Sequence, residues 1–564
     1  MNYLERYAFW CDAGLPEDVR AELNAIAQDT EELKSRFGSD LQFGTAGMRG
    51  IMGVGSNRLN RYTVRRAAQG MAAWLSGTDL PKKAAIAYDS RHNSQLFAEV
   101  CAVALAEAGI RTYLYDRLAP TPMLSFAVRQ LGCGCGIVIS ASHNAGAYNG
   151  IKCYGPDGCQ MTDEPAAVVT EKIASVDFFI PESKPFDAFL AEGAITYIGQ
   201  DIWEKYYQTV MAEAVDPDVI KRASLNIVYT PLCGTGNEPV REILGRLGTN
   251  ITVVSAQEKP DGDFKTCEYP NPETDAALNE SYKVARSTPC DVILGTDPDA
   301  DRVAIAVPSA DGFRKLSGNE LGCMLLDYIL KARAARGDLP VGGEVIRSIV
   351  STPMADRIAA HYGVAMKPVL TGFKYIGGEI LALEEKGEEY KYIFGFEESC
   401  GYLKGTYARD KDAVVASMLV CEMTAALKEQ GKTILDALED LYRTYGYFLA
   451  YVQNIELTGA DAMEKAAKMM ADLRDDMPAA IGGVSVTKVN DYKISLSKDF
   501  ATGKDERIDL PQSNVLEMIL GDNGSVIARP SGTEPKVKFY YCAVGESYEA
   551  SKKLLDAMIA QMSK

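Results

Sequence analysis

Three aspartates stand at alternate positions, Asp297, Asp299 and Asp301, in a short polar segment that follows an apolar run. In an extended loop this spacing points the three carboxylates to the same side, where a cation must relieve their mutual repulsion. A ligand set made only of oxygen favours Mg²⁺ or Ca²⁺ over zinc. The segment is not an EF-hand, because Arg302 stands where that loop requires Gly. A metal loop and a solvated acidic turn are the two interpretations.

A serine follows another apolar run, in the segment Ser140-Ala141-Ser142-His143-Asn144, and Lys152 comes ten residues after Ser142. Ser142 fits either a phosphoryl carrier or a turn residue that bonds to its own backbone. The pair Ser142 and His143 also suggests a nucleophile and its base. However, neighbours on a strand point to opposite faces, and the chain has no Gly-x-Ser-x-Gly elbow here. The residues therefore give a hydrolase triad little support.

Near the C-terminus, Arg529, Ser531, Gly532 and Thr533 lie between two predicted strands. A forked guanidinium, two hydroxyls and exposed backbone N–H groups suit a phosphate dianion. The alternative is a hairpin turn without a ligand.

Two more segments carry polar groups at the end of, or just after, a predicted strand. Glu397 and Ser399 could bond to sugar hydroxyls, or could cap a helix. The run from Arg409 to Asp412 offers Lys411 as a general acid or base if burial and Arg409 lower its pKa, while a solvated charge run is the ordinary alternative.

Close to the N-terminus, the stretch 44–50 is rich in glycine but lacks the Lys of a P-loop. We interpret it as a tight loop that presents Arg49.

The segments that position these residues alternate between short apolar runs and helical patterns, which is typical of βαβ units. Three strands run into polar loops, at Ser142, at Asp297 and at Glu397. Because ligands bind beyond the carboxyl ends of parallel strands, these loops predict one composite site. The last part has a different pattern, of an α+β domain. The predicted domains are residues 1–207 with the Ser142 loop, 208–317 with the Asp loop, 318–446 with the Glu397 loop and 447–564 with the Arg529 loop.

The composition bounds the function. The 564 residues carry a net charge of −18, and such a surface repels nucleic acid and anionic lipid on average. An anionic substrate therefore needs a local cluster of positive charge. The chain has 13 Cys without a Cys-x-x-Cys pair and only three His, which favours reduced thiols and argues against a His-rich zinc site. Charged residues near the N-terminus and the shortness of the apolar runs predict a cytoplasmic protein without membrane segments.

Taken in order along the chain, these loops resemble those of the α-D-phosphohexomutase superfamily, and most of all its long-form phosphoglucomutases. The resemblance implies α/β architecture, with three similar mixed-sheet α/β domains and a C-terminal α+β domain around a central cleft. It assigns the phosphoryl carrier to Ser142, not to Ser140. It implies Mg²⁺ bound by Asp297, Asp299, Asp301 and the Ser142 phosphate.

The resemblance also assigns the other site residues. Lys411 matches the acid/base lysine, Arg49 and Lys152 match an active-site Arg and Lys, and His143 is expected to hold the loop. The expected substrate-binding residues are Glu397, Ser399, Arg302, Arg409, Arg529, Ser531, Gly532 and Thr533. Two departures from the family pattern are Ala145 where many members have Pro, and Cys400 where an aromatic residue is common.

The implied reaction interconverts glucose 1-phosphate and glucose 6-phosphate, with glucose 1,6-bisphosphate as intermediate and activator. Small sugar phosphates are the expected partners, and nucleic acid and membranes are not. Phosphopentomutase, phosphomannomutase and glucose-1,6-bisphosphate synthase share these loops and remain alternatives. A haloacid-dehalogenase phosphatase would leave the Ser142 and Arg529 loops without a task. A sugar-phosphate-binding protein or a calcium-stabilised structural protein without catalysis is a further alternative.

Overall fold

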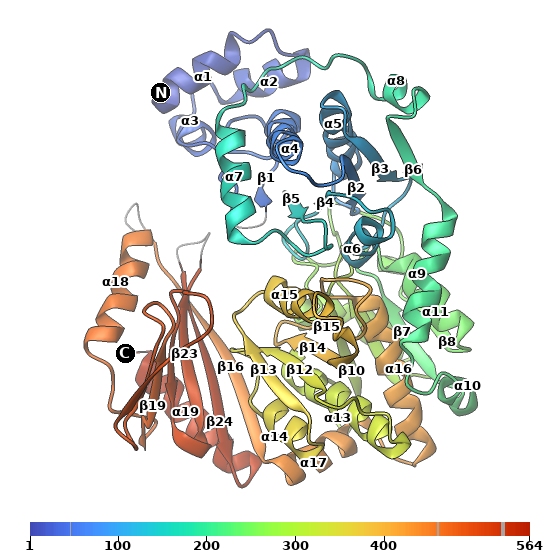
Figure 1. The fold of residues 1–564 in the computed structure, drawn as a ribbon, viewed down its shortest axis with the longest axis vertical. Helices are drawn as coiled ribbons and strands as arrows, with labels where there is room; N and C mark the ends of the chain where they lie inside the picture. The colour runs from blue at the N-terminus through green and yellow to red at the C-terminus, as the bar shows by residue number, and fades with distance from the viewer. Residues whose placement is uncertain (45–46, 459–461, 532–535, 564) are drawn as a thin grey trace. The chain divides into compact units, whose positions relative to one another are not determined.

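The computed structural model describes residues 1–44, 47–458, 462–531 and 536–563 (Figure 1). The chain forms two compact units. Unit 1 comprises Met1–Leu316, Gly377–Tyr392 and Gly401–Glu429, and unit 2 comprises Ser317–Ile376, Ile393–Cys400 and Gln430–Lys564. The boundaries of the four predicted domains, and the central cleft expected among them, stay predictions.

The first sheet of unit 1 has six strands in the order β1-β5-β4-β2-β3-β6. The neighbours β2, β3, β4 and β6 are parallel, and β5 and β1 continue the sheet antiparallel. The strands β2 and β4 are buried almost throughout, as expected of parallel strands covered on both faces. The strands are β1 (Gly47–Ile51), β2 (Lys83–Tyr88), β3 (Arg111–Tyr115), β4 (Cys135–Ile139), β5 (Tyr148–Tyr154) and β6 (Ile195–Ile198).

The helices that accompany this sheet are α4 (Arg61–Ser76), α5 (Ser94–Glu107), α6 (Thr121–Gln130), α7 (Asp163–Ala174) and α8 (Phe186–Ala191). The connection β2-α5-β3 and the connection β3-α6-β4 run in opposite directions along the sheet, so right-handed crossovers place α5 and α6 on opposite faces (Figure 1). The carboxyl ends of β2 and β4 thus lie side by side where the winding reverses. The predicted βαβ units are confirmed.

The second sheet, also in unit 1, has the order β11-β10-β9-β7-β8. Here β7 is parallel to both β8 and β9, whereas β10 and β11 are antiparallel additions. The strands are β7 (Asn226–Thr230), β8 (Asn250–Val253), β9 (Val292–Thr296), β10 (Val303–Ser309) and β11 (Gly312–Lys315). The helices are α9 (Gln200–Ala212), α10 (Val219–Ala223), α11 (Asn237–Arg246), α12 (Asp275–Ala285) and α16 (Ala413–Glu429).

The N-terminal segment forms a helical layer that the sequence analysis did not single out. It consists of α1 (Tyr3–Cys11), α2 (Glu17–Ile26) and α3 (Thr30–Phe37). Its core contains Trp10, whose ring contacts those of Phe37, Tyr62, Phe178 and Phe179 edge to face. This aromatic cluster attaches the layer to the first sheet's helices.

Unit 2 contains a third strand arrangement, in which β12 (Glu344–Ser348) is parallel to β13 (Ala365–Val369) and has β14 (Tyr392–Glu397) as its other neighbour. The strand β14 enters this unit at Ile393, and β15 (Gly401–Leu403) belongs to unit 1. The helices are α13 (Gly318–Arg336), α14 (Met354–His361), α15 (Phe373–Glu384), which belongs to unit 1 from Gly377 on, and α17 (Ile434–Tyr445).

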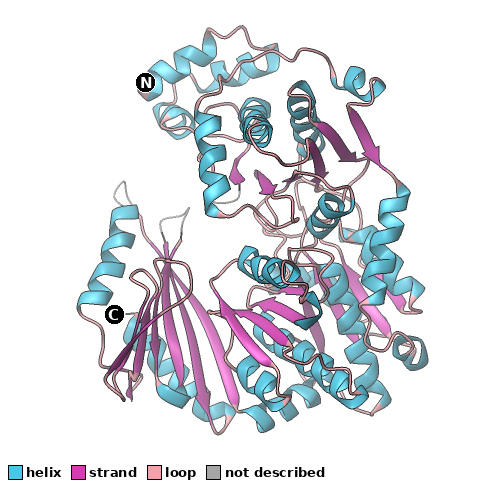
Figure 2. Ribbon diagram, in the orientation of Figure 1, coloured by secondary structure: helices cyan, strands magenta, loops and turns pink. Residues whose placement is uncertain are grey.

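The last sheet, in unit 2, is antiparallel throughout, in the order β16-β24-β23-β22-β19-β20-β21 (Figure 2). Helices α18 (Ala462–Asp475) and α19 (Tyr548–Met562) pack on it. The predicted fold class, three mixed α/β sheets followed by an α+β part, is confirmed. The strands are β16 (Tyr447–Glu456), β19 (Lys488–Asp491), β20 (Leu496–Asp499), β21 (Lys504–Arg507), β22 (Leu516–Ile519), β23 (Gly524–Pro530) and β24 (Lys536–Gly545), with β17 (Ala480–Ile481) and β18 (Val484–Ser485) as a separate pair.

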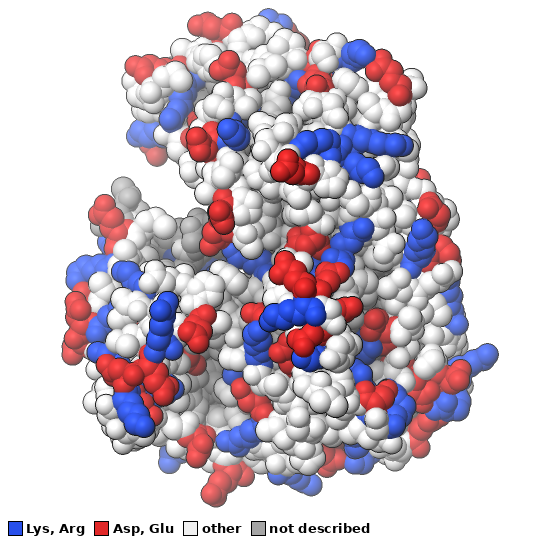
Figure 3. All heavy atoms as spheres, viewed as in Figure 1, with Lys and Arg blue, Asp and Glu red and all other residues white. Residues whose placement is uncertain are grey.

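Three global expectations can be compared with the structure. Across the described ranges all cysteines are free, and all but Cys11 and Cys290 are buried, as predicted. None of the helices in the described part of the chain is long and apolar enough to cross a bilayer. On the face seen in Figure 3, acidic and basic side chains are interspersed. Local clusters of charged side chains, and not the net charge of the chain, must therefore determine which charged ligands bind.

Candidate functional site

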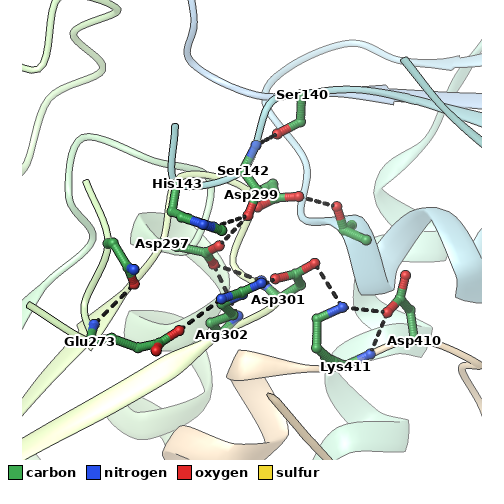
Figure 4. A network of polar contacts seen from close by, with 12 residues as sticks. Ser140, Ser142, His143, Glu273, Asp297, Asp299, Asp301, Arg302, Asp410 and Lys411 are labelled. Carbon is green, nitrogen blue, oxygen red and sulfur yellow. Dashed lines mark hydrogen bonds and ion pairs between the residues drawn. The ribbon is translucent and has the colours of Figure 1, made fainter. Parts of the chain in front are cut away.

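Two of the loops singled out from the sequence meet inside unit 1 (Figure 4). The Ser142 loop follows β4, and the Asp loop connects β9 to β10. The hydroxyl of Ser142 donates a hydrogen bond to Oδ2 of Asp297 over 2.8 Å, and only 3% of Ser142 is exposed. Residues 155 positions apart are thereby brought into direct contact, as the composite site requires.

The three aspartates converge as predicted, but for a different reason. Each offers an oxygen within 4.8 Å of the others, and all three residues are buried. The expectation of an extended loop is wrong. The backbone N–H of Ala300 bonds to the carbonyl of Asp297 over 2.9 Å, and Ala300 has φ +50°. Oδ1 of Asp297 accepts from the N–H groups of Asp301 and Arg302, so a tight turn gathers the carboxylates.

The free oxygens of this cluster fit a hard cation. Among the described residues, none donates a hydrogen bond to Oδ1 of Asp299 or Oδ1 of Asp301, although both atoms are buried. Buried acceptors normally find a partner, and an unsatisfied one in a native protein calls for an explanation such as an ion. A donor set made only of carboxylate oxygens suits Mg²⁺ or Ca²⁺. The chemistry of the residues present therefore agrees with a metal at this place.

Two lysines neutralise part of the negative charge of the three aspartates. Nζ of Lys152 lies 2.6 Å from Oδ2 of Asp299 and 3.2 Å from Oδ2 of Asp301, and Nζ of Lys411 lies 3.2 Å from the same Asp301 oxygen. These ammonium groups therefore supply part of the positive charge that was expected to relieve the repulsion.

The carboxylates differ in their proton affinity. Burial raises the pKa of Asp297 well above its usual value, and the charges of Asp301 and Asp299 add to this. Burial also acts to raise the pKa of Asp299, but Lys152 outweighs it and holds that pKa below its usual value. For Asp301, Lys152 and Lys411 overcome burial in the same way and lower the pKa. Asp297, the partner of Ser142, is thus the carboxylate most in need of further positive charge.

Lys411 is buried, so its segment is not a solvated charge run. Arg409, Asp410 and Asp412 are buried with it. Oδ1 of Asp410 lies 2.9 Å from Nζ of Lys411, and Oδ2 of Asp410 accepts from the hydroxyl of Tyr154 over 2.8 Å. Asp410 and Tyr154 therefore fix the ammonium group of Lys411 between two carboxylates.

Two predicted substrate-binding arginines are ion-paired in the structure. The guanidinium of Arg409 pairs with Glu384 at 2.5 Å. Nη1 of Arg302 donates to Oε1 of Glu273 over 2.8 Å (Figure 4). Their contacts with a substrate stay a prediction.

Ser142 and His143 do not point to opposite faces as the strand argument expected. Ser142 lies beyond the end of β4 with φ +52°, and this turn leaves its Oγ 3.1 Å from Nδ1 of His143. Burial lowers the pKa of His143 well below its usual value, and the positive charges of Arg302 and Arg49 act in the same direction. The imidazole is therefore neutral at physiological pH.

Arg49 lies on a strand and not in a loop, which corrects the sequence analysis. It belongs to β1, whose Gly47 is paired with Lys152 of β5. Nη1 of Arg49 donates to Oδ1 of Asn144 over 2.9 Å. The sheet thus brings Arg49 to the Ser142 loop.

One supporting residue escaped the sequence analysis. Thr121, the first residue of α6, donates its hydroxyl to Oδ2 of Asp299 over 2.7 Å and its N–H to the Asp299 carbonyl over 2.9 Å. Threonine is common at the start of a helix, so the sequence around Thr121 gave no signal of a role in the site. Only its contact with Asp299 in the folded chain identifies it.

The two remaining loops belong to unit 2. Glu397 ends β14, is buried, and accepts from the N–H of Gly372 over 2.7 Å, while Ser399 in the following turn is half-buried. Arg529 lies on β23, and the N–H of Ser531 donates to the carbonyl of Lys536 over 2.8 Å. Gly532 and Thr533 lie outside the described residues. That these loops face Ser142 stays a prediction.

Comparisons with known proteins bear on the whole chain. Models of the phosphoglucomutase/phosphomannomutase family match in order: alpha/beta/alpha domain I at residues 40–179, domain II at 204–311, domain III at 317–445 and the C-terminal domain at 459–561. A phosphoglucomutase from Staphylococcus epidermidis is 35% identical over 534 residues, which cover 94% of this chain and 96% of that protein. One from Staphylococcus aureus is 36% identical over 535 residues, 94% of each chain.

A solved structure has the same fold. The open form of the Paramecium phosphoglucomutase parafusin superposes with a TM-score of 0.66 at 16% identity, covering 93% of this chain and 94% of that one.

Proposed function

Because the chain belongs to the phosphoglucomutase/phosphomannomutase family, we propose that it interconverts glucose 1-phosphate and glucose 6-phosphate through a phosphoserine at Ser142 and a glucose 1,6-bisphosphate intermediate. One observation carries the proposal: the hydroxyl of Ser142 is buried and lies 2.8 Å from a carboxylate of the Asp triad. A turn serine would bond to its own backbone. This one faces the carboxylates that need positive charge, as a phosphate-bearing serine in a metal site does.

In the first half of the reaction, the bond between phosphorus and Ser142 Oγ breaks, and phosphorus forms a bond with the free hydroxyl oxygen of the sugar phosphate. That hydroxyl loses its proton to Lys411, which enters this step as the neutral amine and becomes the ammonium that Asp301 and Asp410 hold. In the second half, the other phosphoryl group returns to Ser142 Oγ, and Lys411 returns the proton to the sugar oxygen. Neutral His143 holds the loop through its contact with Ser142 Oγ.

Phosphoryl transfer depends mainly on position and on fixed charge. Asp297, Asp299, Asp301 and the phosphate on Ser142 would hold Mg²⁺, which would supply positive charge to the phosphoryl-transfer step. Lys152 is fixed by Asp299 and Asp301, and Arg49 by Asn144, so neither cation has to reorganise during transfer.

The proposed partners are sugar phosphates, and the proposed location is the cytoplasm. Two phosphoglucomutases at 35% and 36% identity support glucose over the alternative sugars. Phosphomannomutase, phosphopentomutase and glucose-1,6-bisphosphate synthase activities are tested by the same assays with the corresponding substrates.

The direct test combines turnover and mass. A coupled assay should show formation of glucose 6-phosphate from glucose 1-phosphate, accelerated by glucose 1,6-bisphosphate. The intact mass should rise by one phosphoryl group after incubation with the bisphosphate. Turnover without any covalent phosphate would contradict the phosphoserine route, and a phosphoprotein that only makes bisphosphate would favour the synthase.

The phosphate loop of unit 2 gives a prediction for substrate binding. Arg529→Ala should raise KM for both glucose phosphates by on the order of tenfold to a hundredfold, because a charge-assisted bond to the non-reacting phosphate is lost. Ser142 should still be phosphorylated by the bisphosphate. Arg507→Ala on β21, an exposed strand of the same sheet, is the matched control. Unchanged KM values for Arg529→Ala would remove this loop from the site.

The Glu397 loop gives a prediction for sugar selection. Glucose 1-phosphate should be preferred over mannose 1-phosphate, and Glu397→Ala should erode this ratio of kcat/KM, since a polar group left unpaired costs about 1–3 kcal/mol. Glu397→Gln keeps an acceptor for the N–H of Gly372 and separates loop folding from recognition. If the unmodified protein handles mannose 1-phosphate equally well, the assignment to glucose is wrong.

A further inference from the structure

A buried arginine lies directly behind the Ser142 loop. Asp89 and Arg91 follow β2, and the Ser142 loop follows β4, its parallel neighbour. The N–H of Asp89 bonds to the carbonyl of Ile139, the last residue of β4, over 3.0 Å. The two loops therefore leave the sheet side by side, at the point where its winding reverses.

All the hydrogen bonds found for the terminal nitrogens of Arg91 go to backbone carbonyls of the Ser142 loop. Nη2 donates to the carbonyl of Ser142 over 2.6 Å and to that of Asn144. Nη1 donates to the carbonyls of Ala145 and Tyr148 over 2.9 Å each. A single planar group thus connects four carbonyls over seven residues of loop.

The guanidinium is itself held by an ion pair and by packing. Its Nε lies 3.3 Å from Oδ2 of Asp89, and both side chains are completely buried. Oδ1 of Asp89 accepts from the N–H of Arg91 over 3.0 Å and from the hydroxyl of Ser94 over 2.7 Å. The ring of Phe264 covers the guanidinium, with its centroid 4.9 Å away. Arg91 is therefore a fixed template for the loop.

The Ser142 loop needs such a template. Ser142 has φ +52°, a left-handed conformation that persists in a residue with a side chain only when its surroundings impose it. Its N–H is fixed by Oγ of Ser140 over 2.7 Å, and its carbonyl by Arg91. With both ends of the residue held, Oγ is aimed at Asp297.

We propose that Arg91 is a positioning residue for phosphoryl transfer: by clamping the backbone of residues 142–148 it sets the direction of Ser142 Oγ. The inference rests on the proposed function for its kinetic consequence, but not for its structural one. Lysine cannot replace Arg91, because it has only one nitrogen from which to donate hydrogen bonds. In Arg91, two nitrogens held in a rigid plane reach the four carbonyls.

The test compares Arg91→Lys with Arg65→Lys. Arg65 is a buried arginine of the same sheet layer, paired with Glu107 at 2.6 Å and bonded to the carbonyls of Ile180 and Pro181. Arg91→Lys should lower kcat by on the order of a hundredfold, with KM changed less than about threefold, because misplacing a reacting atom slows transfer without removing a substrate contact. Ser142 should also take up phosphate from glucose 1,6-bisphosphate more slowly. Arg65→Lys should keep kcat and KM.

Hydrogen exchange measured by mass spectrometry gives the readout that is independent of activity. Peptides covering residues 140–149 should exchange faster in Arg91→Lys and unchanged in Arg65→Lys. Loss of activity with unchanged exchange would overturn the clamp, as would a normal kcat in Arg91→Lys. If the unmodified protein has no mutase activity, the proposed function fails, while the exchange result still tests whether Arg91 clamps the loop.

A second variant covers the case in which Arg91→Lys does not fold. Asp89→Asn removes the charge that pairs with the guanidinium and should show the same two effects more weakly. Normal kcat and normal exchange in Asp89→Asn would contradict the proposal.

Discussion

Replacing Ser142 with alanine is expected to abolish the interconversion of glucose 1-phosphate and glucose 6-phosphate. The substitution removes the atom that carries the phosphoryl group between half-reactions, and no neighbouring hydroxyl occupies the same position. Ser140, the nearest candidate in sequence, uses its Oγ to accept from the N–H of Ser142. The fold should persist, because a single loop hydroxyl contributes little to the core.

The measurement combines the coupled assay with phosphopeptide mapping, and Ser140→Ala is the matched control. It loses one buried hydrogen bond, worth about 1 kcal/mol, so it should be less stable and somewhat slower but still phosphorylated on Ser142. Normal mutase activity in Ser142→Ala, or phosphate found only on Ser140, would show that the carrier is assigned to the wrong residue.

The second large effect is expected at the Asp triad. Asp299→Asn should lower turnover by on the order of a hundredfold or more, because it removes one anionic ligand from the metal site and also the anion that pairs with Lys152. The wild-type protein should lose activity in a chelator and regain it with Mg²⁺.

A binding readout separates metal loss from general damage. Mg²⁺ should raise the melting temperature of the wild-type protein, as a ligand bound only to the folded state does, and this shift should shrink in Asp299→Asn. Asp311→Asn, at an exposed position after β10, should behave as wild type. Full activity of Asp299→Asn in the presence of a chelator would exclude the metal assignment.

Local sequence was sufficient for the order of elements and for most of the chemistry. Parallel strands covered by helices on both faces are apolar along their whole length, so β4 and β9 are recognisable, and the polar residues that follow them are candidates by position alone. Side-chain chemistry then limits Asp297, Asp299 and Asp301 to hard cations. The N-terminal helical layer was not singled out from the sequence, although most of its core comes from its own helices. Phe178 and Phe179 complete that core from a distant segment.

Several local expectations were wrong where long-range contacts decide the conformation. The alternate spacing of the aspartates suggested an extended loop, but backbone bonds within the segment make a turn. For the charged run around Lys411, a solvated face and a buried acid/base were both left open. Partners from other segments, Asp301 and Tyr154, offset the cost of its burial. Arg49 was expected in a loop because its segment is rich in glycine and does not follow a clear strand. The structure makes it a strand by pairing it with β5, more than ninety residues away.

The amino-acid sequence reveals which chemical groups are present, and that the loops carrying Ser142 and the aspartates follow strand ends. Which of these groups touch, and which unremarkable residues hold them, depends on the packing of distant segments. In the first sheet the loop after β2 supports the Ser142 loop through Arg91, and in the second the N–H of Thr235, after β7, bonds to the carbonyl of Pro298 in the Asp loop over 2.8 Å. Strand order places these loops side by side. Because strand order is fixed by the packing of the whole domain, no pattern within either loop specifies its partner.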